Sequence, residues 1–195
     1  MTLRIEALEG LALAAAIDDV ARLRIAVFRD WPYLYDGSLD YERRYLRPYL
    51  DSPGAVVVGA FDGETLVGAA TGTPMADHAA EFAAPLAKAG IGVDETFYCA
   101  ESVLLPGYRG QGAGHRFFDL REAKARDLGA TWSVFCSVVR PADHPLRPAD
   151  YRPLDGFWRA RGYAPVEGAL AEFAWQDIGE PGETVKPLQI WARRL

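Results

Sequence analysis

Residues 104–129 read LLPGYRGQGAGHRFFDLREAKARDLG, and this stretch decides the fold. Gly110, Gly112 and Gly114 stand at alternate positions between an apolar run and a segment with helical character. Glycine lets the backbone adopt positive φ and approach a ligand closely. A helix that begins after such a loop directs free N–H groups and the positive end of its dipole at the loop, which suits a diphosphate. The stretch therefore predicts a strand, a phosphate-binding loop with Arg109 beside it, and a helix.

Two common phosphate-binding loops do not fit this glycine spacing. A P-loop requires G-x-x-x-x-G-K-[ST], and no Gly-Lys-Ser/Thr occurs in the chain. A dinucleotide-binding loop requires G-x-G-x-x-G, whereas these glycines are two apart throughout and His115 follows the third. A tight turn that binds nothing is the alternative, although three glycines make such a turn costly in conformational entropy.

Outward from this stretch, the chain alternates strand and helix patterns without repeated β-α-β units. Asp62-Gly63 between two β-rich runs predicts a hairpin over 55–74. Other strands are expected over 2–8, 95–105 and 131–139. A further strand begins at 163–166, and 169–179 and 187–195 are expected to form the final antiparallel pair. The expected helices cover 16–32, 38–50, 77–90, 115–129 and 154–162. This order predicts an α/β protein with a mixed sheet.

The six residues RGQGAG match the signature [QR]-x-x-G-x-[GA] through Arg109, Gly112 and Gly114. In this signature, its surrounding sequence and the order of elements along nearly the whole chain, the protein resembles the GNAT-type N-acetyltransferases. The resemblance implies an α/β (layered α+β) acyl-CoA N-acyltransferase fold, with residues 1–195 as a single domain. The implied sheet is central, mixed and mostly antiparallel, with about seven strands and helices on both faces.

The resemblance also implies acetyl-CoA as co-substrate and assigns its binding residues by position. The strand before the loop is expected to bulge and to splay from its neighbour. Its backbone groups are expected to pair with the pantetheine arm, and one N–H to polarise the thioester carbonyl. The loop is expected to hold the diphosphate, and the late helix to contribute two aromatic residues. The expected cofactor-binding residues are Val103, Leu104, Leu105, Arg109, Gly110, Gln111, Gly112, Ala113, Gly114, His115, Phe157 and Trp158.

The resemblance implies direct attack of an amine on the thioester, which needs a base for the amine and a proton for the leaving thiolate. Glu101 is the expected base, because it is a carboxylate in an apolar strand; a structural ion pair with an arginine is the alternative. Many family members carry a tyrosine acid in the late helix, but Trp158 stands at that position, and an indole cannot give up its proton. Water or Tyr151 could supply the proton instead, or the protein could be non-catalytic. An acyl-enzyme on Cys136 is conceivable but would need an activated thiolate.

The acceptor is expected at the connection between the first two helices. Trp31, Tyr33, Tyr35 and Asp36 lie there among further carboxylates, and aromatic rings with carboxylates suit a cationic amine. A solvated loop that anchors its aromatic residues in the core is the alternative. The sequence therefore predicts a small acceptor with a primary amine, either cationic or like an amino acid.

Composition narrows the class of protein. The formal net charge of −6 argues against nucleic acid as a partner. We find no Cys/His motif of a metal site, no apolar stretch long enough to span a membrane and no signal-peptide pattern. We therefore expect a cytoplasmic protein without a metal or a membrane partner, and a homodimer is an option. The leading prediction is an acyl-CoA-dependent N-acetyltransferase; the alternative is a non-catalytic acyl-CoA sensor of the same fold.

Overall fold

The computed structural model describes residues 3–78 and 80–195, without the side chains of 80 and 81. Thr2 of the first expected strand and position 79 of the third expected helix lie outside the described residues. The helices are α1 Gly10–Phe28, α2 Leu39–Asp51, α3 Ala80–Lys88, α4 Ala113–Asp127 and α5 Asp155–Ala160. The strands are β1 Arg4–Leu8, β2 Val56–Asp62, β3 Thr65–Pro74, β4 Thr96–Tyr98, β5 Ser102–Leu104, β6 Trp132–Val138, β7 Ala164–Gln176 and β8 Glu183–Arg194.

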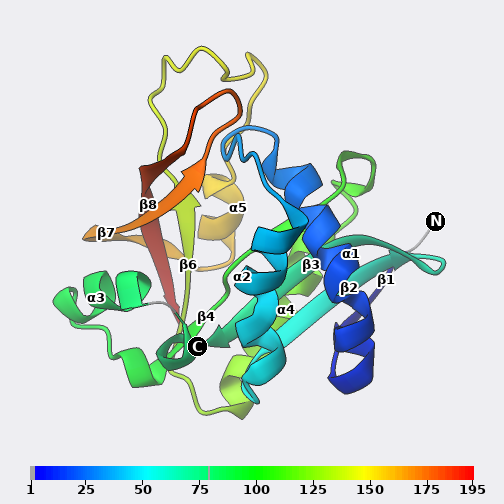
Figure 1. The fold of residues 1–195 in the computed structure, drawn as a ribbon. Coiled ribbons are helices and arrows are strands. Elements are labelled where there is room, and N and C mark those ends of the chain that lie inside the picture. The colour runs from blue at the N-terminus through cyan, green and yellow to red at the C-terminus, as the bar shows by residue number, and fades with distance from the viewer. Residues whose placement is uncertain (1–2, 79) are drawn as a thin grey trace.

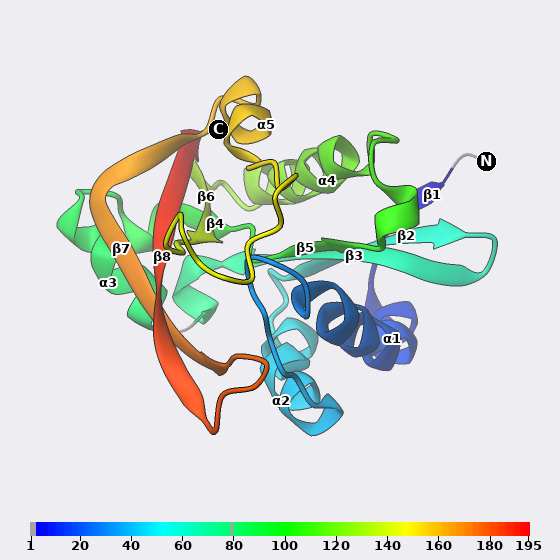
Figure 2. The ribbon, with the colours of Figure 1, turned by 90° about the horizontal axis from the view of Figure 1, so that it is seen from above.

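The strands form one sheet in the order β1-β2-β3-β4-β6-β8-β7, and β5 also pairs with β3. The pairing is antiparallel except between β4 and β6, which run parallel. The expectation of a mixed, mostly antiparallel sheet is therefore confirmed. Helices cover both faces: Figures 1 and 2 show α1 and α2 on one face, and α4 with α5 on the other.

The side chains of β2 point alternately to the two faces of the sheet, so this strand packs against the helices on both faces. Val57 belongs to the core cluster that contains Val20 of α1, whereas Val56 and Val58 belong to the cluster that contains Phe117 of α4. Successive side chains of a strand point to opposite faces, so one apolar run can pack against helices on both sides. The two apolar clusters thus fix the helices that carry the candidate site residues.

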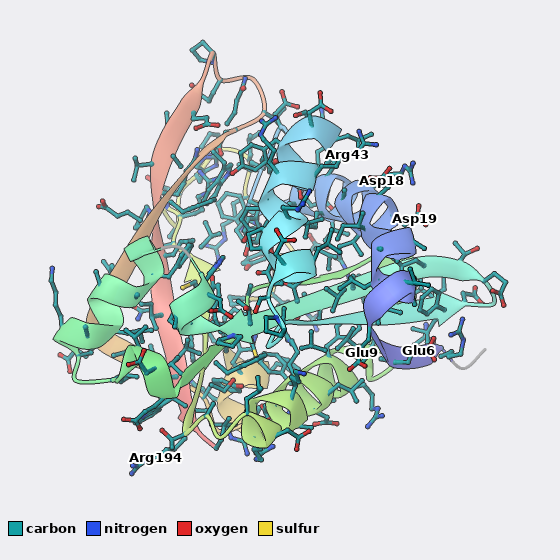
Figure 3. The ribbon with its side chains drawn as sticks, turned by 60° about the horizontal axis from the view of Figure 1, so that its bottom comes forward. Glu6, Glu9, Asp18, Asp19, Arg43 and Arg194 are labelled. Atoms are coloured by element: carbon teal, nitrogen blue, oxygen red, sulfur yellow. The ribbon has the colours of Figure 1, made fainter. Side chains whose placement is uncertain are left out.

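An ion pair ties α1 to α2 on their outer surface. Arg43 of α2 donates from Nε and Nη2 to the two carboxylate oxygens of Asp18 of α1, at 2.9 and 2.8 Å. Figure 3 shows Asp18, Asp19 and Arg43 on the surface of this helix pair. The pair is exposed, so solvent screens the attraction and its contribution to stability is small. The two helices are held mainly by their buried faces.

The strand expected over 95–105 is interrupted before the glycine loop, where the resemblance implied that it bulges and splays. β4 pairs with β3 and with β6, whereas β5 pairs only with β3 among the described residues. Residues 99–101 lie between them outside any strand. The edge of β5 that would continue toward β6 is therefore free, and we call it the free edge of β5.

In the last part of the sheet, the strand that begins within 163–166 continues through the apolar run of 169–179. It is β7, which is continuous from Ala164 to Gln176. Its pairing with β8 is irregular between Pro165 and Leu170, where Gly168 has φ of +70°. A bulge of this kind lets a long strand bend without ending, so the two apolar runs belong to one strand.

Candidate active site

The glycine loop lies directly before α4. Gly110 and Gly112 have φ of +78° and +84°, and a Cβ at either position would meet no described atom within 4 Å. α4 begins at Ala113, and the N–H groups of His115 and Arg116 in its first turn both donate to the Gly112 carbonyl, at 3.0 and 3.3 Å. The loop therefore combines left-handed glycines and open space with the N–H groups of Ala113 and Gly114, which have no partner within the helix, and this arrangement suits an anionic ligand.

Side chains around the loop support it from two sides. Arg109 donates from Nε to the carbonyl of Leu104 at 3.2 Å, so this arginine lies against the end of β5. An added Cβ at Gly114 would lie 3.4 Å from the Phe157 ring, which also packs edge-on against the ring of His115 at 4.9 Å. α5 therefore packs against the loop through Phe157, close to where the sequence predicted it.

The hydrogen bonds of β5 decide which backbone groups face its free edge. Leu105 donates its N–H to the Val67 carbonyl at 3.0 Å. Bonded pairs alternate in an antiparallel ladder, so Val103, opposite Ala69, also directs its backbone groups to β3. The backbone groups of Val103 and Leu105 are thus used within the sheet, and their expected pairing with a pantetheine arm stays a prediction. Leu104 alone of the three expected residues faces the free edge, where its carbonyl accepts the hydrogen bond from Arg109.

Arg121 of α4 lies beneath the strand interruption. It is almost fully buried, and Nη1 donates to the carbonyls of Thr71 and Glu101, both at 3.1 Å. Nη2 donates to the Ser102 hydroxyl at 2.9 Å, and Nε to the Phe117 carbonyl at 3.1 Å. The guanidinium is thus held by three carbonyls and one hydroxyl, with no carboxylate within ion-pair distance in the described part of the chain.

Glu101 belongs to a buried chain of charges. Its carboxylate forms an ion pair with Arg24 of α1 and accepts hydrogen bonds from Thr71 and, at 3.5 Å, from the Tyr49 hydroxyl. Arg24 also pairs with Glu42 of α2. Burial lowers the pKa of Arg24, but Tyr45 and the charge of Glu42 raise it more, so the net shift is upward. Two carboxylates therefore share one permanently charged guanidinium, which is the ion pair that the sequence left as the alternative for Glu101.

A pocket opens above this charged chain, and we call it the aromatic pocket. Its cavity volume is about 70 Å³, room for roughly five water molecules. It is lined by Arg24, Phe28, Tyr33, Tyr35, Tyr41, Tyr45, Phe82, Tyr98, Ala100, Glu101, Cys136, Phe173, Trp175 and Leu188. Nine different helices, strands and loops contribute to this wall. It reaches the strand interruption through Ala100 and Glu101.

Two of the four expected acceptor residues line the aromatic pocket and two do not. Tyr33 and Tyr35 are in its wall, and burial raises the pKa of Tyr33 to about 12. Trp31 packs instead against His144 at 5.0 Å, and Asp36 is an exposed residue that pairs with Arg29 at 3.3 Å. Neither Trp31 nor Asp36 is among the lining residues, so an acceptor role for them stays a prediction without support from this pocket.

A cluster of charged side chains holds Tyr33 in place. Arg140 pairs with both oxygens of Asp177 at 2.7 and 3.0 Å and donates to the carbonyls of Pro32 and Tyr33 at 2.8 and 2.6 Å. Trp175 donates its indole N–H to the same Tyr33 carbonyl at 3.0 Å. The connection between α1 and α2 is therefore tied to the end of β7, which fixes one wall of the pocket.

The two aromatic residues considered for proton transfer lie elsewhere. Trp158 packs in the core against Phe135 and Trp191, at ring distances of 5.0 and 5.1 Å. Tyr151 packs edge-on against Trp31 at 6.0 Å and does not line the aromatic pocket. Burial is the main cause that raises the pKa of Tyr151. Neither Trp158 nor Tyr151 is among the residues that line the aromatic pocket beside Glu101.

Cys136 of β6 does line the aromatic pocket. Burial raises the pKa of its thiol to about 12, so the thiol stays protonated at neutral pH. A thiolate is the nucleophilic form of cysteine. The environment of Cys136 therefore opposes an acyl-enzyme route.

Arg24, Glu42 and Arg121 were missed from the sequence, although a signal was present. Arg24 stands four residues from both Val20 and Phe28, on the buried stripe of α1. Glu42 stands four before Leu46 on the buried stripe of α2, and Arg121 stands four from Phe117 and Ala125 on α4. A charge on the apolar stripe of a helix is costly unless it is paired or hydrogen-bonded, so these positions mark buried polar contacts.

The described residues form neither a candidate metal site nor a membrane-spanning helix. Within residues 3–78 and 80–195, no group of three or more His, Cys, Asp or Glu side chains is placed to hold a metal ion. None of the helices in the same residues is long and apolar enough to cross a membrane.

Comparisons with known proteins agree with this geometry. A model of the acetyltransferase (GNAT) family matches residues 20–148, more than half of the chain. No curated protein shows a significant match. The fold is similar to that of a ribosomal-protein-alanine N-acetyltransferase from Brucella melitensis, at 12% identity over 100% of both chains with a TM-score of 0.62.

Two similar structures were solved with a bound coenzyme. YncA from Salmonella typhimurium, with its cofactor acetyl-CoA, is 11% identical over 100% of this chain and 95% of that chain, with a TM-score of 0.62. The PaiA N-acetyltransferase from Thermoplasma acidophilum, in complex with coenzyme A, is 13% identical over 100% of both chains, with a TM-score of 0.54. At these identities the likeness is one of fold.

Proposed function

Because the chain belongs to the acetyltransferase (GNAT) family, we propose that it transfers the acetyl group of acetyl-CoA to the primary amine of a small acceptor by direct attack. The observation that carries the proposal is the glycine loop. Gly110 and Gly112 adopt positive φ at the start of α4, immediately after the free edge of β5. The diphosphate would take the loop N–H groups, and the pantetheine arm would follow the free edge.

The acceptor would occupy the aromatic pocket, beside Ala100 and Glu101. Its nitrogen attacks the thioester carbon, the C–S bond breaks, and the amine loses a proton while the thiolate gains one. We assign the base to Glu101, which accepts the proton directly or through water. The ion pair with Arg24 holds this carboxylate at the pocket wall.

For the leaving thiolate we assign water as the proton source. Trp158 is packed in the core and has no acidic proton, and Tyr151 lies against Trp31. Tyr151 is the remaining alternative. Replacement by phenylalanine should leave the rate of transfer within about twofold if water supplies the proton, and should lower it by 10²-fold or more if Tyr151 is the acid.

A thiol-release assay with a panel of primary amines tests the function, with Glu101→Gln as the variant for the base. If Glu101 is the base, kcat should fall by about 10²–10⁴-fold with little change in KM for acetyl-CoA. If Glu101 is only structural, the variant should lose stability while its kcat per folded molecule stays the same. Absence of acetyl-CoA binding to the wild-type protein would reject the proposal as a whole.

A second candidate is a non-catalytic acyl-CoA sensor. The position of Trp158, where the family commonly has a tyrosine, favours it. This reading requires that acetyl-CoA binds and that no amine in the panel releases its thiol. Release of thiol with any amine, together with the acetylated product, would exclude it.

A further inference from the structure

The charged residues in the wall of the aromatic pocket limit what an acceptor can carry. Arg24 and Glu101 are the charged residues among those that line it. Arg24 is already shared between Glu42 and Glu101, and all three side chains are buried. A carboxylate on the acceptor would lose its hydration in this pocket and would meet no free cation. Leaving a buried charge without a partner costs several kcal/mol.

The remaining wall suits an apolar or aromatic body. Side chains of tyrosine, phenylalanine, tryptophan and leucine surround the cavity, and among them Phe173 and Trp175 of β7 lie 6.4 Å apart. Aromatic walls of this kind gain energy by burying apolar surface and by edge-to-face contacts with a ring. The acceptor amine itself can approach Glu101 and the π-faces of the tyrosines.

We infer that the acceptor is an amine with an aromatic or alkyl body and no carboxylate, and therefore not a free amino acid. The inference rests on the proposed function, because it names the substrate class for the same pocket. It separates the two kinds of acceptor that the sequence left open, cationic amines and amino-acid-like molecules.

The test compares two pairs of molecules that differ only in a carboxylate: phenethylamine with phenylalanine, and tyramine with tyrosine. Acetyl transfer is measured as kcat/KM. Binding of each molecule is measured separately by calorimetry with the CoA-saturated protein, in which no acetyl group is available for transfer. We expect each amine to exceed its amino acid by about tenfold or more in both measurements. Equal values, a preference for the amino acids, or no binding of either amine would overturn the inference.

Binding separates this inference from the proposed function. If phenethylamine binds selectively but is not acetylated, the substrate class stands and the proposed transfer fails. A gain-of-function variant sharpens the result: Phe173→Lys places a cation in the pocket wall, and it should reduce the preference for phenethylamine over phenylalanine. Glu172→Lys, on the exposed side of the same strand, is the control and should leave the preference unchanged.

A different observation carries a second inference, which concerns Arg121. In a regular antiparallel ladder, Thr71 and Glu101 would exchange two hydrogen bonds. Thr71 does donate its N–H to the Glu101 carbonyl at 3.0 Å, but the Thr71 carbonyl accepts instead from Nη1 of Arg121 at 3.1 Å. The guanidinium thus takes the place of the Glu101 N–H at the point where β4 and β5 separate.

We propose that Arg121 is a positioning residue that maintains the strand interruption and the free edge of β5. Arg121 lies on α4, the helix that follows the glycine loop, eight residues after Ala113. Buried guanidinium groups are normally paired with carboxylates. The Arg121 guanidinium instead donates to the carbonyls of Thr71 and Glu101 at the strand interruption. Without it, the Thr71 carbonyl would need another donor, and the regular ladder offers the Glu101 N–H.

The test uses ADP and CoA, which share the adenosine diphosphate group, while CoA adds a 3′-phosphate and the pantetheine arm. Both ligands are titrated calorimetrically into Arg121→Met and wild type. We expect CoA to bind at least about tenfold more weakly and ADP to bind within about twofold of wild type, because the glycine loop is unaffected. Arg126→Met, on the exposed face of the same helix, is the control and should change neither affinity.

Two results would overturn this role: an unchanged CoA affinity, or an equal loss of both ligands, which indicates general damage to α4. Arg121→Lys keeps the charge with fewer donors and should give an intermediate loss for CoA alone. If Arg121→Met does not fold, the lysine variant decides the question by the same comparison. A lysine variant with equal loss of ADP and CoA would reject the proposal.

Discussion

Substitution of valine for Gly112 tests the glycine loop, and a second glycine of α4 provides a matched control. Gly112 precedes the helix with φ of +84°, and Gly129 follows it with φ of +76°. A Cβ at either position would meet no described atom within 4 Å. Both substitutions therefore carry the same kind of backbone strain and no steric clash, but only Gly112 lies where the diphosphate is proposed.

The expected magnitudes follow from this geometry. A left-handed conformation costs a residue other than glycine about 1–2 kcal/mol, so each variant should melt roughly 2–8 °C below wild type. Saturation with CoA at 100 times its Kd should stabilise wild type by about 2.7 kcal/mol. Gly129→Val should keep this gain, whereas Gly112→Val should lose most of it because the side chain blocks the approach of the diphosphate.

Thermal unfolding with and without CoA measures both effects in one experiment. The comparison of the two variants removes the contribution of backbone strain, which they share. Full CoA stabilisation of Gly112→Val would refute the assignment of the loop to the diphosphate. Loss of the CoA effect in Gly129→Val as well would mean that the whole helix, rather than the loop, determines binding.

Three further predictions concern aromatic and thiol groups. Trp158→Phe should keep kcat within about twofold and lose about 1 kcal/mol of stability, because the indole packs in the core; a hundredfold fall in kcat would contradict this. Cys136→Ser should remain active, and wild-type initial-rate lines should intersect, because burial raises the pKa of the thiol to about 12; parallel lines would instead indicate an acyl-enzyme. Burial raises the pKa of Cys136 from 9.0 and that of Tyr33 from 10.0, both to about 12. The folded state binds these protons more tightly than the unfolded state, so stability in urea should be complete below pH 9 and fall toward pH 12; a constant free energy of unfolding over this range would oppose the burial of both groups.

The glycine loop and its helix could be predicted because their signals are local. Positive φ at Gly110 and Gly112 and the hairpin turn at Asp62-Gly63 depend on residues adjacent in sequence. The fold class followed from the order of such elements. Periodicity along one segment carries enough information for these features.

The strand interruption depends on a distant contact, and local patterns could not show it. Residues 95–105 read as one strand, whereas Arg121 takes the Thr71 and Glu101 carbonyls from another helix. The acceptor prediction grouped Trp31 with Tyr33 because they are close in sequence, but only Tyr33 lines the aromatic pocket. Tyr33 lines the aromatic pocket because Arg140 holds its carbonyl, while the neighbouring Trp31 packs against His144.

The most direct test of the account is acetyl transfer itself, followed with acetyl-CoA and phenethylamine. CoA thiol and acetylated amine are measured in the same reaction by thiol titration and mass spectrometry. The account predicts that both products appear in equal amounts, at a rate that Glu101→Gln lowers by 10²-fold or more. Binding of acetyl-CoA without thiol release, for this and every other primary amine tested, would contradict the proposed transferase.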